Sequence, residues 1–174
     1  MVGVIDADLG VNVDLRSSER TYQLLEQVSG RAGRGDKKGR VYLQSYNTNH
    51  PVIKSLVNRD IDGFINNELK SREMLHMPPY GRLAGLVISG LNEQKVMELS
   101  ENIVRVAKKY QKVIEVFGPI PALIFRLKTK YRFRVLMKSK KDIKLQKVIS
   151  DILKEINIPS SLKIKIDIDP YNFM

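Results

Sequence analysis

Residues 83–113 read LAGLVISGLNEQKVMELSENIVRVAKKYQKV, and within this stretch the pattern changes from that of a strand to that of a helix. Apolar residues dominate 83–91, which predicts a strand. From Glu93 to Val113 the apolar positions recur every three or four residues, which predicts a helix that buries one face. These positions are Val96, Leu99, Ile103, Ala107 and Tyr110. A strand that leads into an amphipathic helix is the first half of a split βαβ unit.

The remainder of the second half completes this unit. We expect a strand at 114–117 that stops at Gly118-Pro119, a hairpin formed by 123–128 and 131–138, a helix at 141–156 and a strand at 162–168. The predicted order is therefore β-α-β-β-α-β, the ferredoxin-like arrangement, which also occurs in RNA-binding and ribosomal proteins. With its sheet and two amphipathic helices complete, this part of the chain is expected to fold independently.

The first half has a different pattern, in which short apolar strands alternate with helices. Strands are predicted at 2–5 and 39–46, and helices at 19–28 (with Ser17 or Ser18 as N-cap, and Gly30 and Gly33 at its end), 51–57 and 61–74. Two short strands make an incomplete α/β unit, and a strand that starts at residue 2 suggests that the chain begins within a domain. The segment Met77-Pro78-Pro79-Tyr80-Gly81 cannot continue a helix, so we predict domains at 1–76 and 77–174.

Composition excludes several classes of protein. The 174 residues include no Cys, which rules out disulfide scaffolds, Cys-ligated zinc or iron–sulfur sites and a Cys nucleophile within this chain. His50 and His76 are the only histidines, and they lack metal-ligand spacing, so no metal site is predicted. No apolar run reaches the ~18 residues of a membrane span. The acidic N-terminus does not resemble a signal peptide, so the expected compartment is the cytoplasm.

The charge is distributed unevenly along the chain. The formal net charge is +11, and residues 75–174 carry 19 basic and 9 acidic residues, whereas residues 1–74 are nearly balanced. An excess of this kind favours an anionic partner such as nucleic acid for the second part. Composition alone fits a lysine-rich, solvated surface equally well.

The sharpest local signal is the segment from Gln27 to Gly35, QVSGRAGRG, which places two arginines among closely spaced glycines at the end of a predicted helix. Arginine forks bind phosphate oxygens through two hydrogen bonds and stay charged at any working pH. Held against a transferring γ-phosphate, Arg31 or Arg34 would act as an arginine finger. The alternative is a helix C-terminus with two solvated arginines.

This segment resembles motif VI of superfamily 2 helicases, and the wider string Arg16–Arg34 resembles the primosomal protein N′ (PriA) family of replication-restart helicases. Further similar segments follow in family order along the chain: Gly39–Asn47, His50–Val52, Met77–Ala84, Phe117–Ala122, Tyr131–Lys138 and Ile166–Pro170. The resemblance implies an ATP-dependent 3′-5′ DNA helicase of primosome assembly. It implies the last part of a RecA-like second helicase lobe, followed by a C-terminal α+β domain.

The resemblance also implies roles for the motif VI residues. The other lobe would hold ATP together with Mg²⁺, and Arg31 and Arg34 would contact the γ-phosphate of that ATP. Gln27 would couple nucleotide binding to lobe closure. This chain has no Walker A loop, no acidic Mg²⁺ motif and none of the family's zinc-binding cysteines. Two arginines cannot by themselves position a phosphoryl group and a water, so ATP hydrolysis by this chain alone is not expected. Asp6 and Asp8 resemble a helicase acidic pair, but ordinary polar residues at a strand end are the preferred interpretation.

A second candidate site is the basic hairpin. Alternation places Lys130, Arg132 and Arg134 on one strand face, and Tyr131, Phe133 and Val135 on the other, where core packing is favoured over base stacking. The candidate DNA-binding residues are Arg126, Lys128, Lys130, Arg132, Arg134 and Lys138. They could neutralise phosphates of forked or single-stranded DNA without reading bases. A merely solvated sheet face is the alternative.

The family resemblance further implies protein partners. These are single-stranded-DNA-binding protein, other primosome proteins and the missing helicase lobe, and no membrane contact is expected. Lys144 and Gln146, at the start of the last helix, are candidates to bind the acidic, hydrophobic-ended tail of the single-stranded-DNA-binding protein. The competing hypothesis is a stand-alone nucleic-acid- or protein-binding module without enzymatic activity, because fold analogy alone does not assign function.

Overall fold

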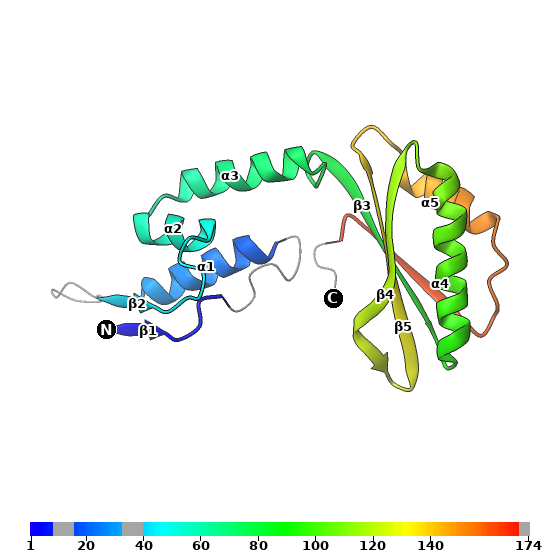
Figure 1. Cartoon of the computed structure of the whole chain (residues 1–174), viewed down its shortest axis with the longest axis horizontal. Helices are drawn as coiled ribbons and strands as arrows, with labels where there is room; N and C mark the ends of the chain where they lie inside the picture. Colours follow the sequence, from blue (N-terminus) through cyan, green and yellow to red (C-terminus); the bar gives the residue numbers. More distant parts are fainter. Residues whose placement is uncertain (9–15, 33–39, 171–174) are drawn as a thin grey trace. The chain divides into compact units, whose positions relative to one another are not determined.

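The computed structural model describes residues 1–8, 16–32 and 40–170, which form two compact units, Met1–Lys70 and Ser71–Met174 (Figure 1). The first unit contains β1 (Val2–Val4), α1 (Ser17–Ser29), β2 (Val41–Leu43), α2 (Pro51–Asn58) and most of α3 (Ile61–Met74). The strands β1 and β2 pair in parallel, with Val2 opposite Val41 and Val4 opposite Leu43. This is the α/β pattern expected from the sequence, and the assignment to a RecA-like lobe stays a prediction.

A small apolar core holds the first unit together. Tyr22 of α1 stacks on Phe64 of α3, with ring centroids 4.7 Å apart and planes inclined by 9°. Leu25, Val52 and Ile53 are buried in the same cluster. The predicted N-cap is wrong, since α1 begins at Ser17 itself and Arg16 occupies the cap position without a side-chain hydrogen bond. Ser17 lies inside the first turn and is buried.

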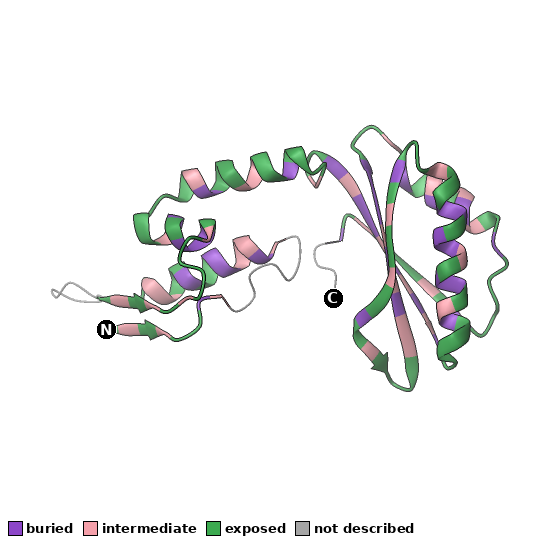
Figure 2. Cartoon of the chain, viewed as in Figure 1, coloured by how far each residue is buried: buried purple, intermediate pink, exposed green. Residues whose placement is uncertain are grey.

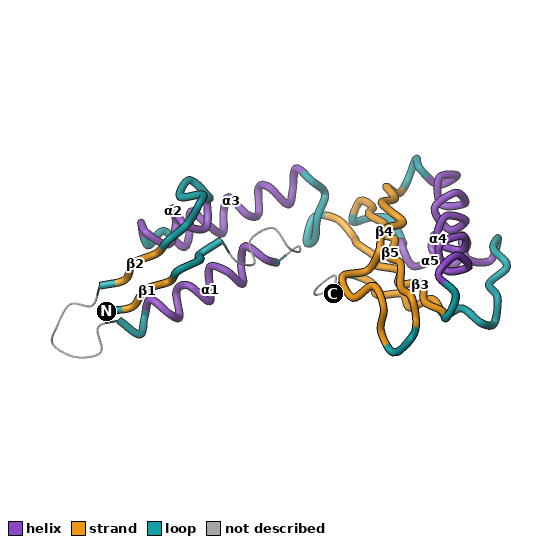
Figure 3. Tube along the Cα trace, turned by 60° about the horizontal axis from the view of Figure 1, so that its bottom comes forward, coloured by secondary structure: helices purple, strands orange, loops and turns teal. Residues whose placement is uncertain are grey.

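The second unit has the predicted β-α-β-β-α-β order. Its elements are β3 (Gly81–Gly90), α4 (Glu93–Ala107), a short 3-10 turn (Lys108–Tyr110), β4 (Ile114–Leu127), β5 (Lys130–Lys140), α5 (Leu145–Lys154) and β6 (Lys163–Ile168). The strands form one sheet in the order β4-β5-β3-β6, and every neighbouring pair is antiparallel. Both helices lie on the same side of this sheet (Figures 1 and 3). Neither α4 nor α5 lies on the opposite face.

The main core lies between the sheet and these two helices. Ala84, Leu86 and Ile88 of β3 point into it together with Val135 and Met137 of β5. From α4 and α5 it receives side chains that include Ile103, Leu145 and Ile152, all of which are fully buried. Buried and half-buried residues consequently alternate along much of β3 and β5, as the purple and pink colouring of Figure 2 shows. A strand that buries alternate residues against helices presents the others to the opposite face.

One predicted strand boundary is wrong. The sequence predicts that a strand stops at Gly118-Pro119, whereas β4 continues to Leu127. Its pairing with β5 shifts register between Phe117 and Ile120 and again between Pro121 and Arg126. Gly118 has φ of 102°, a conformation that glycine adopts without strain, so extra residues bulge out and pairing resumes at Ile120. Cross-strand pairing thus overrides the local turn signal.

The division between the two units falls at Lys70/Ser71, six residues before the predicted boundary. The last turn of α3 is bonded to the residues that follow it. The amide of Met77 donates to the carbonyl of Arg72 at 2.8 Å, and Nη1 of Arg72 donates to the carbonyl of Pro78 at 3.4 Å. This turn therefore belongs with the second unit. In the described part of the chain, no helix has the length and apolar character needed to cross a membrane.

Candidate nucleic-acid interface

The face of the sheet opposite α4 and α5, here called the open face, carries the basic side chains of the hairpin. On β5, Phe133, Val135 and Met137 are buried in the core, which confirms the predicted alternation at Phe133 and Val135. Arg132 and Arg134 therefore project to the open face, where both are partly exposed. Tyr131 is also partly exposed, and its ring lies 5.5 Å from that of Phe125.

Strand register aligns these arginines with lysines of another strand. Arg134 is opposite Val87 of β3, which is opposite Lys165 of β6. Arg132 is opposite Ser89, which is opposite Lys163. We call the four residues Arg132, Arg134, Lys163 and Lys165 the basic rows. They lie on one face because Ile164, Ile166 and Ile168 alternate with the two lysines and face the helices.

Lys163 and Lys165 were not among the predicted DNA-binding residues. The sequence 163–168, KIKIDI, shows the alternation that puts both lysines on one face of a strand. That pattern alone does not reveal which strand lies beside β6. The basic rows become visible only when β6 is known to pair with β3 rather than with the hairpin.

Three further predicted residues lie at the free end of the hairpin. Arg126, Lys128 and Lys130 are all exposed. Lys128 and Thr129 form the turn with positive φ values of 46° and 68°, the conformation of the tight turns that match the strand twist. The guanidinium carbon of Arg126 lies 5.2 Å from the centroid of the Tyr131 ring. These cations are available to a ligand that extends beyond the basic rows.

Lys138 differs from the other predicted residues, because it is 9% exposed. Its Nζ lies 3.1 Å from a carboxylate oxygen of Glu115 and donates to the carbonyl of Leu75 at 3.0 Å. It also lies 5.7 Å from the centroid of the Phe117 ring. Its charge is thus used within the protein, where it satisfies the end of α3, and the structure does not place it with the exposed cations.

The predicted motif VI residues lie at the end of α1. Gln27 is exposed on the helix, and Arg31 follows it, with its side chain exposed and its amide donating to the carbonyl of Val28 at 3.2 Å. Gly30 ends the helix with helical backbone angles. Arg34 lies outside the described residues.

The acidic pair Asp6 and Asp8 follows β1. One carboxylate oxygen of Asp8 accepts a hydrogen bond from the Ser45 hydroxyl at 2.8 Å, and the other accepts from the amide of Tyr46 at 2.6 Å. The amide of Asp8 in turn donates to the carboxylate of Asp6 at 3.0 Å. The Ser45 hydroxyl, and then the Tyr46 amide, hold the pKa of Asp8 below its ordinary value. These contacts join the ends of β1 and β2, in line with the structural interpretation of the pair.

Two hollows with apolar floors complete the description. The first, about 550 Å³, lies between α5 and β6 and is lined by Gln146, Ile149, Ser150, Leu153, Lys154, Ile166 and Ile168. It includes the predicted partner residue Gln146. Lys144, the other predicted partner residue, is exposed at the N-cap of α5 and does not line this hollow.

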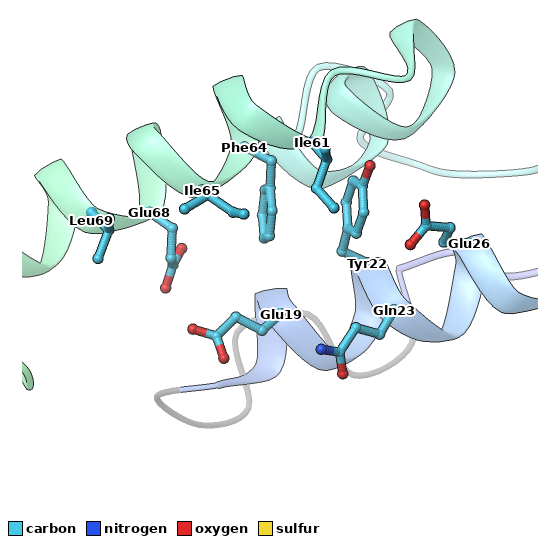
Figure 4. A pocket seen from close by; sticks show the side chains of 9 residues that line it. All are labelled: Glu19, Tyr22, Gln23, Glu26, Ile61, Phe64, Ile65, Glu68 and Leu69. Atoms are coloured by element: carbon cyan, nitrogen blue, oxygen red, sulfur yellow. The ribbon is translucent and has the colours of Figure 1, made fainter.

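The second hollow, about 330 Å³, lies between α1 and α3 of the first unit (Figure 4). Tyr22, Phe64 and Ile65 provide apolar walls, and the carboxylates are those of Glu19, Glu26 and Glu68. Burial, together with the charge of Glu26, raises the pKa of the Tyr22 hydroxyl. Because the rim is acidic, phosphate groups would be repelled there. Of the described surfaces, the open face is therefore the better candidate for nucleic acid.

Comparison with known proteins identifies the class to which this fold and surface belong. Residues 73–171 match the family described as the Primosomal protein N C-terminal domain, and the chain belongs to that family. This match covers the whole four-stranded sheet, both of its helices and the last two residues of α3.

Similar full-length proteins are named Replication restart protein PriA. The protein from Rickettsia typhi is 48% identical over 174 residues, which cover 99% of this chain and 26% of that protein. Those from Synechocystis and Bacillus subtilis are 43% and 34% identical, over 98% and 100% of this chain and 20% and 22% of their own lengths. The chain thus spans about a quarter of the curated relatives that it matches.

Replacing Ser45 by alanine should raise the pKa of Asp8, because the hydroxyl bond that most lowers it is lost. A carboxyl whose pKa is lowered in the folded state stabilises the fold above its ordinary pKa. That contribution is lost as the pH falls through the lowered value. Carbon-detected NMR titration of the Asp8 carboxyl measures the shift. Ser139→Ala, in the second unit, is the control and should leave this pKa in place. An unchanged Asp8 pKa in Ser45→Ala would contradict the assignment.

Proposed function

We propose that this chain contributes the motif VI arginines and a DNA-binding C-terminal domain to an ATP-dependent 3′-5′ DNA helicase of bacterial replication restart. The proposal rests on the relatives, which are named replication restart proteins, and on their match along the whole chain. It also rests on the open face, where four cations from two strands lie in register. In such a role the chain acts in the bacterial cytoplasm, with DNA and primosome proteins as partners.

The observation that carries the DNA-binding part is the arrangement of the basic rows. Lys163 and Lys165 are exposed, and Arg132 and Arg134 are partly exposed, on a face to which α4 and α5 do not extend. Neighbouring strands lie about 4.8 Å apart, so β5 and β6, on either side of β3, present two lines of charge about 10 Å apart. Cations grouped in this way can neutralise phosphates of a nucleic-acid backbone. Contacts of this kind position DNA without reading its sequence.

The arginines of motif VI supply the enzymatic part of the proposal. Arg31 is exposed just beyond the end of α1, and Gln27 is exposed one turn earlier, so both can reach a nucleotide presented by another polypeptide segment. Arg34 would make the transition-state contact with the γ-phosphate. ATP and Mg²⁺ would be bound by a nucleotide-binding lobe that this chain does not contain, so the chain alone would not hydrolyse ATP.

The hollow beside α5 suggests a second binding function. Its floor is formed by Ile149, Leu153 and Ile166, and Gln146 and Lys154 also line it. The ammonium group of Lys154 lies 3.4 Å from a carboxylate oxygen of Asp151. An acidic peptide that ends in hydrophobic residues matches this chemistry, with side chains on the floor and a carboxylate near Lys154. We propose that the tail of single-stranded-DNA-binding protein binds there. The stand-alone module without enzymatic activity is the alternative to the helicase role.

The DNA-binding proposal is tested by reversing the two arginine charges. The double variant Arg132→Glu/Arg134→Glu should bind a fluorescent single strand more weakly at low salt. The slope of log K against log salt should fall by about 1.4, since each lost phosphate contact removes roughly 0.7 for single strands. Fluorescence anisotropy across a salt series measures both quantities, and a forked DNA gives the parallel comparison.

The matched control is Lys95→Glu/Lys108→Glu, which makes the same change in net charge. Both lysines are exposed, Lys95 on α4 and Lys108 just after it, on the helix side of the sheet. If the control loses as much affinity as the arginine variant, binding reflects net charge alone and the open face is not the DNA site.

The motif VI proposal is tested in a relative of full length, which contains the other lobe. Alanine at the position aligned with Arg34 should lower kcat for ATP hydrolysis by about 10³-fold or more, the magnitude associated with an arginine finger. The KM for ATP should change far less, because the contact forms in the transition state. Alanine at the position aligned with Arg59, which ends α2, is the control. A kcat near that of the unmodified protein would rule out the finger role.

The peptide proposal is tested with a synthetic acidic peptide that ends in hydrophobic residues. Lys154→Glu should weaken its binding by about fivefold, near the upper end for a single exposed charge, as measured by fluorescence anisotropy. Lys95→Glu makes the same charge change on α4 and should have little effect. Equal affinities for the two variants would remove the hollow as the peptide site.

A further inference from the structure

Glycine at position 85 has no evident structural reason. Three glycines occur in β3, and at two of them an added Cβ would be crowded. A Cβ at Gly81 would lie 2.0 Å from the carbonyl oxygen of His76, and one at Gly90 would lie 2.3 Å from Cδ2 of Leu162. At Gly85 an added Cβ would meet nothing within 4 Å, and the backbone has no positive φ. Glycine in a strand interior weakens the strand, so its presence suggests that something approaches the backbone closely.

The open space above Gly85 is on the open face. Leu86 and Ala84, its neighbours in β3, point into the core, so position 85 faces the other way. Across the sheet, Gly85 is opposite Leu136 of β5 and Asp167 of β6, and Leu136 is opposite Phe117 of β4. We call Asp167, Gly85, Leu136 and Phe117 the neutral row, meaning only that it contains no cation, since the carboxylate of Asp167 is charged. It lies beside the Lys165–Arg134 row, two residues or about 7 Å further along the strands.

The neutral row has the properties of a surface for bases. The Phe117 side chain is 47% exposed, although its ring is large and apolar. The bare backbone at Gly85 leaves room for a flat group beside Leu136. Asp167 is exposed and would repel a phosphate, whereas it can accept a hydrogen bond from the amino group of a base. Phosphates are thus favoured on the basic rows and disfavoured on the neutral row.

We propose that the open face binds single-stranded DNA with its phosphates along the basic rows and its bases over the neutral row, where one base stacks on Phe117 and another lies over Gly85. This inference rests on the proposed DNA-binding function and specifies its ligand. In a duplex the base faces are stacked and paired, so only an unpaired strand can use both kinds of row. Stacking on an aromatic side chain is tolerant of sequence, because every base has a flat face.

Filling the space above Gly85 tests the proposal without removing any charge. Gly85→Val places a β-branched side chain where the fold has room, so the strand should be kept or strengthened. The probe is a fluorescent oligodeoxycytidine about 12 nucleotides long, within the range of single-strand sites. Gly85→Val and Phe117→Ala should each weaken binding at least about fivefold, the lower end of what one stacked base contributes. Phe117→Tyr should restore the affinity, and a duplex of the same length should bind all of these variants equally.

Leu91→Ala is the matched control for the loss of an exposed apolar side chain. Leu91 is 67% exposed and lies six residues beyond Gly85, about 20 Å along the strand direction. Its replacement should leave binding unchanged. Circular dichroism and thermal unfolding of each variant establish that the fold is kept.

The outcomes separate this inference from the proposed DNA-binding function. If Gly85→Val and Phe117→Ala bind the oligonucleotide as the unmodified chain does, while Arg132→Glu/Arg134→Glu does not, the face contacts phosphates only and the neutral row has no role. If the arginine variant also binds normally, the DNA-binding function itself is wrong. Selective loss of single-strand binding in Gly85→Val and Phe117→Ala, with rescue by Phe117→Tyr, establishes the stacking surface.

Discussion

The pairing of β3 with both β5 and β6 is the constraint on which the second unit depends. It fixes which side chains of three strands share a face, and it leaves the helices a continuous apolar surface that includes Leu86, Ile88 and Val135. A shift of one residue in either pairing would move the isoleucines of β6 or the valine of β5 to the opposite face. The same shift would bring Arg134 or Lys165 into the core, where a charged side chain is costly to bury. Burial of the core and exposure of the cations are therefore two results of one register.

Much of the second unit was accessible from the sequence, because its signals are local. The helical repeat that contains Val96 and Ile103, and the alternation of Phe133 with Arg134, each depend on residues within one element. The order of elements and the orientation of β5 followed from those repeats. Sequence reasoning failed where the structure depends on neighbours far along the chain. Nothing local shows that Lys165 lies in register with Arg134, or that Lys138 has Glu115 and the carbonyl of Leu75 as partners.

In the first unit, a local sequence motif is easier to recognise than the fold that surrounds it. Its candidate functional residues, Gln27 and Arg31, are predicted from a short glycine-spaced segment, whereas the described part of the fold around them has two short parallel strands. The carboxylate of Asp8 illustrates the difference. By type and position it resembles a catalytic acid, yet its hydrogen bonds to Ser45 and Tyr46 give it a structural task. Residue types at a strand end could not distinguish these roles, since both use the same carboxylate.

The bulged strand β4 has a consequence for how the molecule behaves in a crowded solution. It is an outer strand of the sheet, and it exposes Leu123 and Ile124, the combination that normally invites another chain to add itself to the edge. Pro119 and Pro121 have no amide hydrogen to offer such a strand, and the two register shifts prevent a long flat edge. A strand that leaves these apolar groups uncovered is in this way made a poor template for self-association.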